Sequence, residues 1–264
     1  MRNKAVILTV LFLTMSIGGA IMAQEEDSAR AEMAVKVREM VEQHGADSAI
    51  TFIEDSEDFK QVVGTYNNLM MDLYWKEKSL NAAVPVIDAG IKYCLAKSEE
   101  LAAEDSVMST KLKTMAKVFS FNLASFTWPG WAQEGITITE DDLDAGLEAA
   151  KLNLQLVEEL GADPAQMSNS HWSIGAHYLA RNTPEDYQNA ISAFEFAQFE
   201  AHRVGNKDSE LMSTGYIAMA RILSGSDARE DFDKAVKALN DLGTEDAKYY
   251  AQQLTDVLKI FSEE

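Results

Sequence analysis

The chain has only one cysteine, Cys94, so no disulfide bond can form within it. A protein without disulfides must be held together by burial of its core, and the 47% of residues that are hydrophobic permit this. Further apolar residues follow Cys94 at helical spacing, so we expect a small buried side chain rather than a reactive thiol. The composition therefore predicts a folded protein that is stabilised by its core.

Basic residues are also scarce. The chain has 23 lysines and arginines against 43 aspartates and glutamates, which gives a formal net charge of −20. A chain of this charge repels phosphate backbones and anionic lipid surfaces, so we expect no nucleic-acid partner. We interpret the acidic residues mainly as solvated helix faces that keep the protein soluble.

Sequence motifs of catalysis and metal binding are missing as well. His171 and His177 lie six residues apart, or about 600° around a helix, and no His-Glu-x-x-His occurs. Residues 142–146 have only the start of a calcium-binding loop. No glycine-rich phosphate loop or Gly-x-Ser-x-Gly turn is found. We expect no metal, no cofactor and no enzyme activity, although the many carboxylates leave an unrecognised acidic site as an alternative.

The start of the chain has the layout of a secretory signal peptide. Two cations in residues 2–4 precede an apolar run over residues 5–15, and small residues then lead to a polar break. We expect cleavage after Ala23, with Ala20 as the second choice. The apolar run is shorter than the ~20 residues that span a bilayer. An uncleaved N-terminal anchor is the alternative, because Ile21 is large for a cleavage site.

Removal of residues 1–23 would leave a periplasmic or secreted protein, residues 24–264. This segment holds two cations and no acids, so the mature charge becomes 21 minus 43, or −22. No cysteine lies near the junction, which argues against a lipid anchor. Nothing after residue 24 is apolar enough for a membrane span, and the length suits one large domain.

The sparse prolines mark helix starts. Pro164 follows Asp163 and Pro184 follows Thr183, the arrangement of an N-cap with proline at the first helical position. Elsewhere apolar residues recur every three or four positions, and no stretch alternates as a strand would. Short connections predict antiparallel helical hairpins. The expected helices cover residues 28–43, 47–54, 57–77, 81–103, 106–126, 140–160, 164–181, 184–204, 208–223, 228–242 and 245–261.

Part of the chain repeats itself. Residues 174–181 align with residues 214–221 at an offset of 40, and residues 185–194 align with residues 230–239 at an offset of 45. Two helices per unit, repeated at about forty residues, are typical of a solenoid of helical hairpins.

Small and aromatic residues recur at fixed spacings within the best repeat. The positions are His171, Ile174, Gly175 and Tyr178 in the first helix, and Ala190, Phe194 and Ala197 in the second. This pattern resembles that of the tetratricopeptide repeat (TPR) family, with histidine in place of the usual tryptophan. It is matched best over residues 164–204, less well over 208–242 and weakly over 57–160. Three extra residues between the helices and a missing downstream proline mark the repeats as divergent.

The resemblance implies an all-α fold in which antiparallel helical hairpins stack into a right-handed solenoid. In that fold the first helices of the repeats line a concave binding face. Trp172, Ala176 and Leu179 form an apolar stripe that would face this groove, with core packing as the alternative. Trp128 and Trp131, in the longest expected loop, would form an aromatic clamp or else seal a gap between helices.

The sequence therefore predicts an exported TPR-like scaffold that holds a peptide or protein partner in a concave groove. The alternative is a periplasmic small-molecule-binding accessory protein of a solute-uptake system, which would take a small apolar ligand. The chain is similar to such proteins only in being an exported divergent TPR-like fold. A closed apolar cavity near the tryptophans would favour the small molecule, an open groove the scaffold, and clustered buried carboxylates an enzyme.

Overall fold

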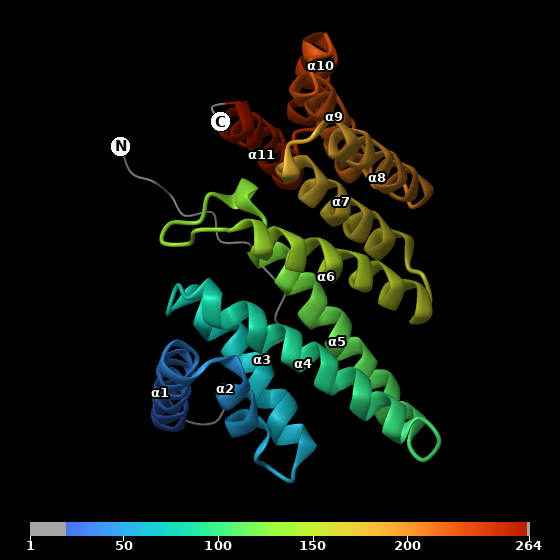
Figure 1. Cartoon of the computed structure of the whole chain (residues 1–264). Helices are drawn as coiled ribbons and strands as arrows, with labels where there is room; N and C mark the ends of the chain where they lie inside the picture. Colours follow the sequence, from blue (N-terminus) through green and yellow to red (C-terminus); the bar gives the residue numbers. More distant parts are fainter. Residues whose placement is uncertain (1–19, 263–264) are drawn as a thin grey trace.

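A computed structural model describes residues 20–262, with side chains from Ala29 onward. The expected signal peptide, residues 1–23, therefore lies almost wholly outside the described residues. Within them the chain forms α-helices and one 3-10 turn, without a strand (Figure 1). The all-α fold expected from the apolar periodicity is confirmed.

Eleven α-helices follow one another over the described residues. They are α1 (Ala20–His44), α2 (Ala46–Glu54), α3 (Phe59–Trp75), α4 (Leu80–Leu101), α5 (Ser106–Phe126), α6 (Glu140–Glu159), α7 (Pro164–Arg181), α8 (Pro184–Arg203), α9 (Lys207–Leu223), α10 (Arg229–Leu242) and α11 (Glu245–Ser262), with the 3-10 turn η1 (Pro129–Trp131) between α5 and α6. Each expected helix is present. The largest difference is that the first helix begins at Ala20 rather than at residue 28.

Side chains cap the helices at the places that the sequence marks. The Asp163 carboxylate accepts hydrogen bonds from two backbone N–H groups in the first turn of α7. The Thr183 hydroxyl accepts one in α8, and Thr139 forms a reciprocal capping box with Asp142 at the start of α6. Each cap satisfies amide groups that have no partner inside the helix.

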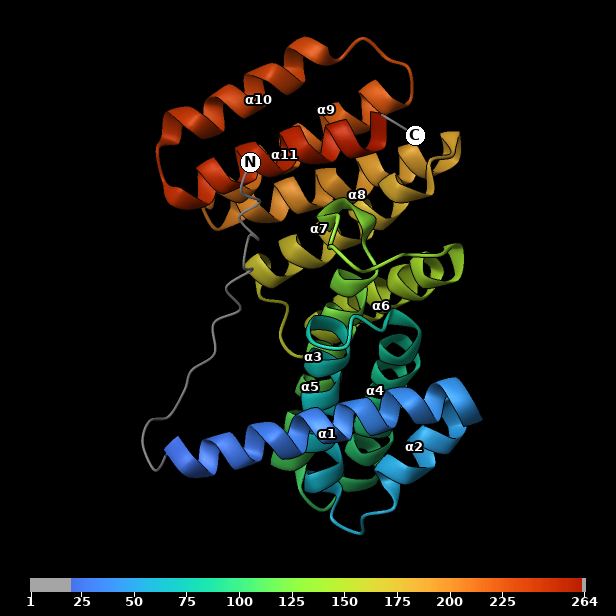
Figure 2. The same cartoon turned by 90° about the vertical axis from the view of Figure 1, so that its left-hand side faces the viewer.

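Consecutive helices contact one another along the whole described chain. Each odd-numbered helix also contacts the next odd-numbered helix, from α1 and α3 through to α9 and α11. In both views the helices form an elongated stack, with α1 and α2 at one end and α10 at the other (Figures 1 and 2). One buried core is built mainly by α1 to α6 and a second mainly by α7 to α11, and the two meet where α6 packs on α7.

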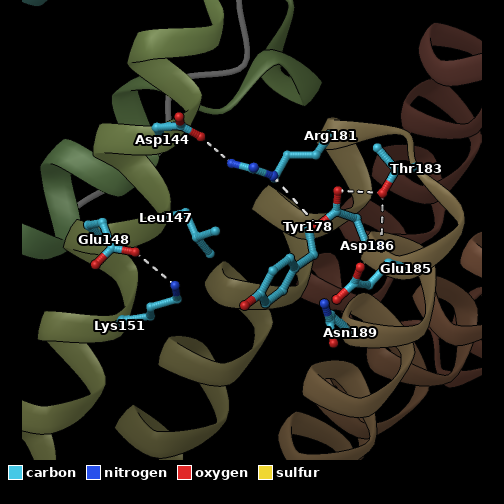
Figure 3. Close-up of a pocket in the computed structure, with 10 residues that line it drawn as sticks. All are labelled: Asp144, Leu147, Glu148, Lys151, Tyr178, Arg181, Thr183, Glu185, Asp186 and Asn189. Carbon is cyan, nitrogen blue, oxygen red and sulfur yellow. Dashed lines mark hydrogen bonds and ion pairs between the residues drawn. The ribbon is translucent and has the colours of Figure 1, made fainter.

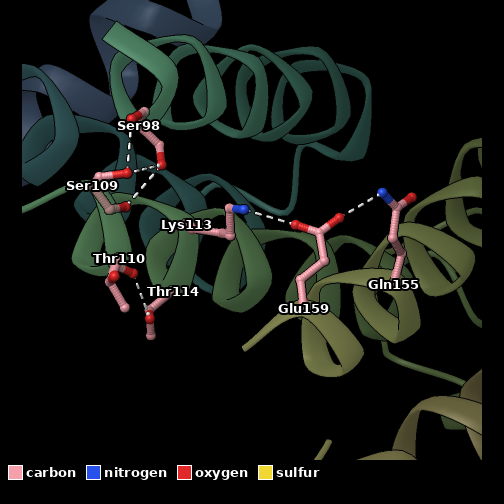
Figure 4. Close-up of polar contacts among 7 residues, drawn as sticks. All are labelled: Ser98, Ser109, Thr110, Lys113, Thr114, Gln155 and Glu159. Carbon is pink, nitrogen blue, oxygen red and sulfur yellow. Dashed lines mark hydrogen bonds and ion pairs between the residues drawn. The ribbon is translucent and has the colours of Figure 1, made fainter. Parts of the chain in front are cut away.

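Polar contacts reinforce the middle of the stack (Figure 4). Ser98 of α4 and Ser109 of α5 each donate a hydrogen bond to the other's carbonyl oxygen, both at 2.8 Å. Lys113 of α5 binds the Glu159 carboxylate of α6 at 2.8 Å, and this hydrogen bond lowers the pKa of Glu159. These contacts join α4, α5 and α6 side by side.

Glycines allow the closest helix approaches. A Cβ atom on Gly175 of α7 would lie 2.6 Å from the ring of Phe194 in α8. The repeat alignment pairs this residue with Gly215 of α9, but a Cβ there would overlap Leu254 of α11. The two aligned glycines thus pack on different kinds of neighbour, so the second unit departs from the first in its packing.

Candidate functional site

The structure brings the three expected binding tryptophans together. The ring of Trp128 lies 4.7 Å from that of Trp131 and 5.3 Å from that of Trp172, and the Trp131 and Trp172 rings are 6.1 Å apart, all between centroids. Tyr216 of α9 extends the cluster, with its ring 5.6 Å from that of Trp172. The turn η1 that carries Trp131 contacts both α7 and α11, so the long loop folds back over the second core.

This aromatic cluster is largely closed. Trp128 is only 2% exposed, and its indole N–H donates to the Ala176 carbonyl oxygen at 3.0 Å. Trp131 is half-buried and donates to the Ser125 carbonyl oxygen at 3.0 Å. Trp172 is half-buried too, and its buried indole nitrogen has no hydrogen-bond partner among the described residues.

The apolar stripe beside this cluster lies in the core. Ala176 and Leu179 are each 1% exposed and belong to the same buried core as Trp128, whose indole N–H bonds to Ala176. Core packing, the alternative that the sequence left open for this stripe, therefore describes the position of Ala176 and Leu179. A binding role for the half-buried rings of Trp131 and Trp172 stays a prediction.

Two other residues with reactive side chains are buried. Burial raises the pKa of the Cys94 thiol to about 12, which fits the small buried side chain expected from the sequence. His177 of α7 is 1% exposed, and its Nδ1 donates to the Ser173 carbonyl oxygen at 2.8 Å. Burial lowers the pKa of His177 to about 4, so the ring is neutral at physiological pH. Neither residue is placed to react with a ligand.

An open pocket of about 560 Å³ lies between α6, α7 and α8 (Figure 3). All three helices contribute to it, and most of its side chains are polar or charged. The lining residues are Asp144, Leu147, Glu148 and Lys151 of α6, Tyr178 and Arg181 of α7, Thr183, which caps α8, and Glu185, Asp186 and Asn189 of α8. No motif in the sequence marks this pocket.

Arg181 holds the three helices around this pocket together. Its guanidinium pairs with the Asp144 carboxylate of α6, and its Nε lies 3.6 Å from the Asp186 carboxylate of α8. The hydrogen bond that Arg181 donates to Asp144 is the main reason that the pKa of Arg181 is raised. Asp186 in turn accepts a hydrogen bond from the Thr183 hydroxyl at 2.7 Å. The upper wall of the pocket in Figure 3 is therefore a connected charged network.

The rest of the pocket is less fully paired. Lys151 binds Glu148 at 2.7 Å, with its ammonium 5.9 Å from the centre of the Tyr178 ring. Glu185 and Asn189 have no side-chain hydrogen bond or ion pair with any residue that the structure describes. Four carboxylates and two cations line the pocket, so its formal charge is 2 − 4, or −2. The groups left for a ligand are a carboxylate, an amide and a phenol ring.

Other kinds of site find no support in residues 20–262. No three histidine, cysteine or carboxylate side chains gather there as a metal site would require. None of the helices in that stretch has both the length and the apolar character needed to cross a membrane.

The sequence carried only part of the signal for this pocket. Tyr178 is one of the repeat positions, and Arg181 aligns with Arg221 in the following repeat. The pairing of Arg181 with Asp144, 37 residues earlier, depends on how α6 packs against α7.

No protein-family model matches this chain, and comparison with curated proteins finds no match either.

Proposed function

We propose that this protein is a TPR-like binding scaffold that holds a segment of a partner protein in the pocket between α6, α7 and α8. The observation that carries the proposal is the pocket itself, which is open, polar and built by three successive helices. Interfaces between proteins have a polar rim and several direct hydrogen bonds, and the free polar groups of this pocket could form such bonds with a partner.

We infer a right-handed solenoid of the TPR type from three supporting features. Consecutive helices contact one another, odd-numbered helices contact the next odd-numbered helix, and Gly175 admits the Phe194 ring of the second helix in its hairpin. The contact of Gly215 with Leu254 in α11 marks the C-terminal unit as divergent. In this arrangement α7 contributes Trp172 to the aromatic cluster and, from a different face, Tyr178 and Arg181 to the pocket.

The chemistry of the pocket favours binding over catalysis. The hydrogen bond from Lys151 to Glu148 raises the pKa of the lysine, so its ammonium keeps its proton and cannot act as a base. Arg181 is likewise held in its charged form by Asp144. A catalytic site is expected to shift its acids and bases towards the working pH, and these shifts go the other way.

A small polar molecule is the second candidate occupant. The volume of about 560 Å³ lies within the range of roughly 300–1,000 Å³ that is common for small-molecule sites. Such sites are mostly apolar, however, and here Leu147 and Tyr178 are the main apolar side chains. A small apolar ligand, the alternative drawn from the sequence, would leave the charged lining without partners.

Site-specific photo-crosslinking tests the proposed function. A photoreactive residue replaces Asn189 in the pocket, and in a matched variant it replaces Gln252, which is exposed on α11. After irradiation in an extract of the producing cells, we expect a protein adduct at position 189 and none at position 252. Equal labelling at both positions, or none at position 189, would contradict the scaffold.

A further inference from the structure

Two phenylalanines are exposed on α8 beyond the pocket. Phe196 is 57% and Phe199 is 59% exposed, and three residues apart on a helix they are neighbours. The Phe196 ring stacks on His171 of α7 at 5.2 Å, and the Arg203 guanidinium lies 6.0 Å from the Phe199 ring. Adjacent exposed aromatic rings are unusual on a soluble surface and are typical of contact sites.

The aromatic pair continues the same helix face as the pocket. Exposed residues follow one another along α8 at spacings of four, three, four and three: Glu185, Asn189, Ser192, Phe196 and Phe199. On α7, Tyr178 and His171 are seven residues, or two turns, apart and face the same side. From Glu185 to Phe196 the helix rises by about 16 Å. We call this surface, formed by the pocket residues with His171, Phe196 and Phe199, the α6–α8 face.

The cations of this face are already paired. Lys151 binds Glu148, and Arg181 binds carboxylates on both sides, as described above. Beside the aromatic pair, Arg203 binds Glu200 at 2.6 Å. A negatively charged ligand would therefore have to break an existing ion pair in order to reach any of these three cations.

Exposed carboxylates on and beside this face, in contrast, are free. Glu158, Glu185 and Glu195 are exposed, and none forms an ion pair with another described residue. Glu158 acts electrostatically on His171, whose ring stacks on Phe196, and Glu195 precedes Phe196 on α8. The charge left for a ligand is negative along the whole face, in a chain whose net charge is −20.

We propose that the α6–α8 face binds an extended, basic segment of a partner protein. A lysine or arginine of that segment lies beside Glu185 and Tyr178, and an apolar side chain covers Phe196 and Phe199. Side chains four or six residues apart in an extended chain share one side and are separated by about 13–20 Å, which matches the rise along α8 from Glu185 to Phe196. This inference rests on the proposed function and specifies the chemistry of the partner.

The test uses labelled peptides with the repeat Leu-Gly-Lys-Gly, in which leucine and lysine share one side of an extended chain. Counterparts carry glutamate for lysine or serine for leucine. Fluorescence anisotropy at physiological ionic strength measures the dissociation constant with the full chain. We expect the parent peptide to bind at least about tenfold more tightly than either counterpart.

Matched variants separate this face from the general negative charge. Glu185→Lys is compared with Glu99→Lys, the same charge change at an exposed position on α4. The double variant Phe196→Ser with Phe199→Ser is compared with Val107→Ser, because Val107 is 64% exposed on α5. We expect each variant of the face to weaken binding about tenfold and each control to change it less than about twofold.

Three results would overturn the proposal. Equal weakening by Glu99→Lys and Glu185→Lys would show that the peptide is attracted only by the general negative charge. If the unmodified protein does not bind the lysine peptide, the partner segment is not basic. A dimer that dissociates in the phenylalanine double variant would show that a second copy covers the face. If position 189 still crosslinks to a partner in the first two cases, the scaffold stands and only the partner's basic character is wrong.

Discussion

His177 illustrates how strongly one buried side chain depends on its surroundings. Its ring lies among α5, α6 and α7, with Nε2 3.4 Å from the Thr127 hydroxyl oxygen. A Cβ atom on Gly146 would overlap both of these groups, so the glycine makes room for them. A protonated ring would therefore have no room beside it for a water molecule to solvate its charge.

This burial predicts a pH dependence of stability. The pKa of His177 falls from an ordinary value of 6.5 to about 4 on folding, so the unfolded chain takes up a proton more readily. The neutral ring supports the fold fully above pH 6.5, and this support is lost as the pH falls towards about 4. The loss amounts to at most about 3 kcal/mol.

Urea denaturation at a series of pH values measures this effect. We expect His177→Gln to flatten the dependence of the unfolding free energy on pH between about 4 and 6.5. The same change at His44, which is exposed at the end of α1, serves as the control and should leave the dependence intact. An unchanged slope in His177→Gln would show that other groups cause it.

At the scale of helices, two glycines distinguish the effect of close helix packing from that of helix propensity. Gly175→Ala places a methyl group 2.6 Å from the Phe194 ring, and we expect a loss of about 1–3 kcal/mol as α7 and α8 move apart. Gly64 of α3 has no atom within 4 Å of the same position, so Gly64→Ala should gain about 0.5–1 kcal/mol from helix propensity. Thermal and chemical denaturation of both variants measures the contrast. A similar effect of the two changes would rule out close packing at Gly175.

The helices could be predicted from the sequence because their signals are local. Asp163 and Thr183 cap the very helices that their neighbouring prolines mark, and the apolar spacing indicates which side of each helix is buried. These local signals do not indicate which neighbouring element covers a given side. The sequence left open whether the stripe with Ala176 faces a groove or packs in the core, and it does not show that the loop around Trp128 folds back onto Ala176.

The pocket lay beyond sequence reasoning for a related reason. It needs Asp144, Arg181 and Glu185 to meet, and each belongs to a different helix. The charge of each residue is visible in the sequence, but ion pairing between helices depends on their separation and rotation. The exposure of the phenylalanines on α8 could not be predicted either, because apolar spacing alone cannot distinguish an exposed side from a buried one.

At the scale of the whole molecule, we propose that the chain is exported. The cationic start and apolar run of residues 1–23 support this, and cleavage would leave a protein of net charge −22 that begins at Gln24. Mass spectrometry of the N-terminal peptide from the purified native protein shows whether cleavage has occurred, and we expect a peptide that begins at Gln24. A native protein that retains Arg2 and Lys4 would show that the segment is not removed.

The central claim is that a partner covers the α6–α8 face, and a competition experiment tests it most directly. The photoreactive residue at position 189 is irradiated in cell extract with rising amounts of the Leu-Gly-Lys-Gly peptide or its glutamate counterpart. The account predicts that the lysine peptide reduces the partner adduct and that the glutamate peptide leaves it unchanged. An adduct that resists the lysine peptide, or no adduct at position 189, would contradict it.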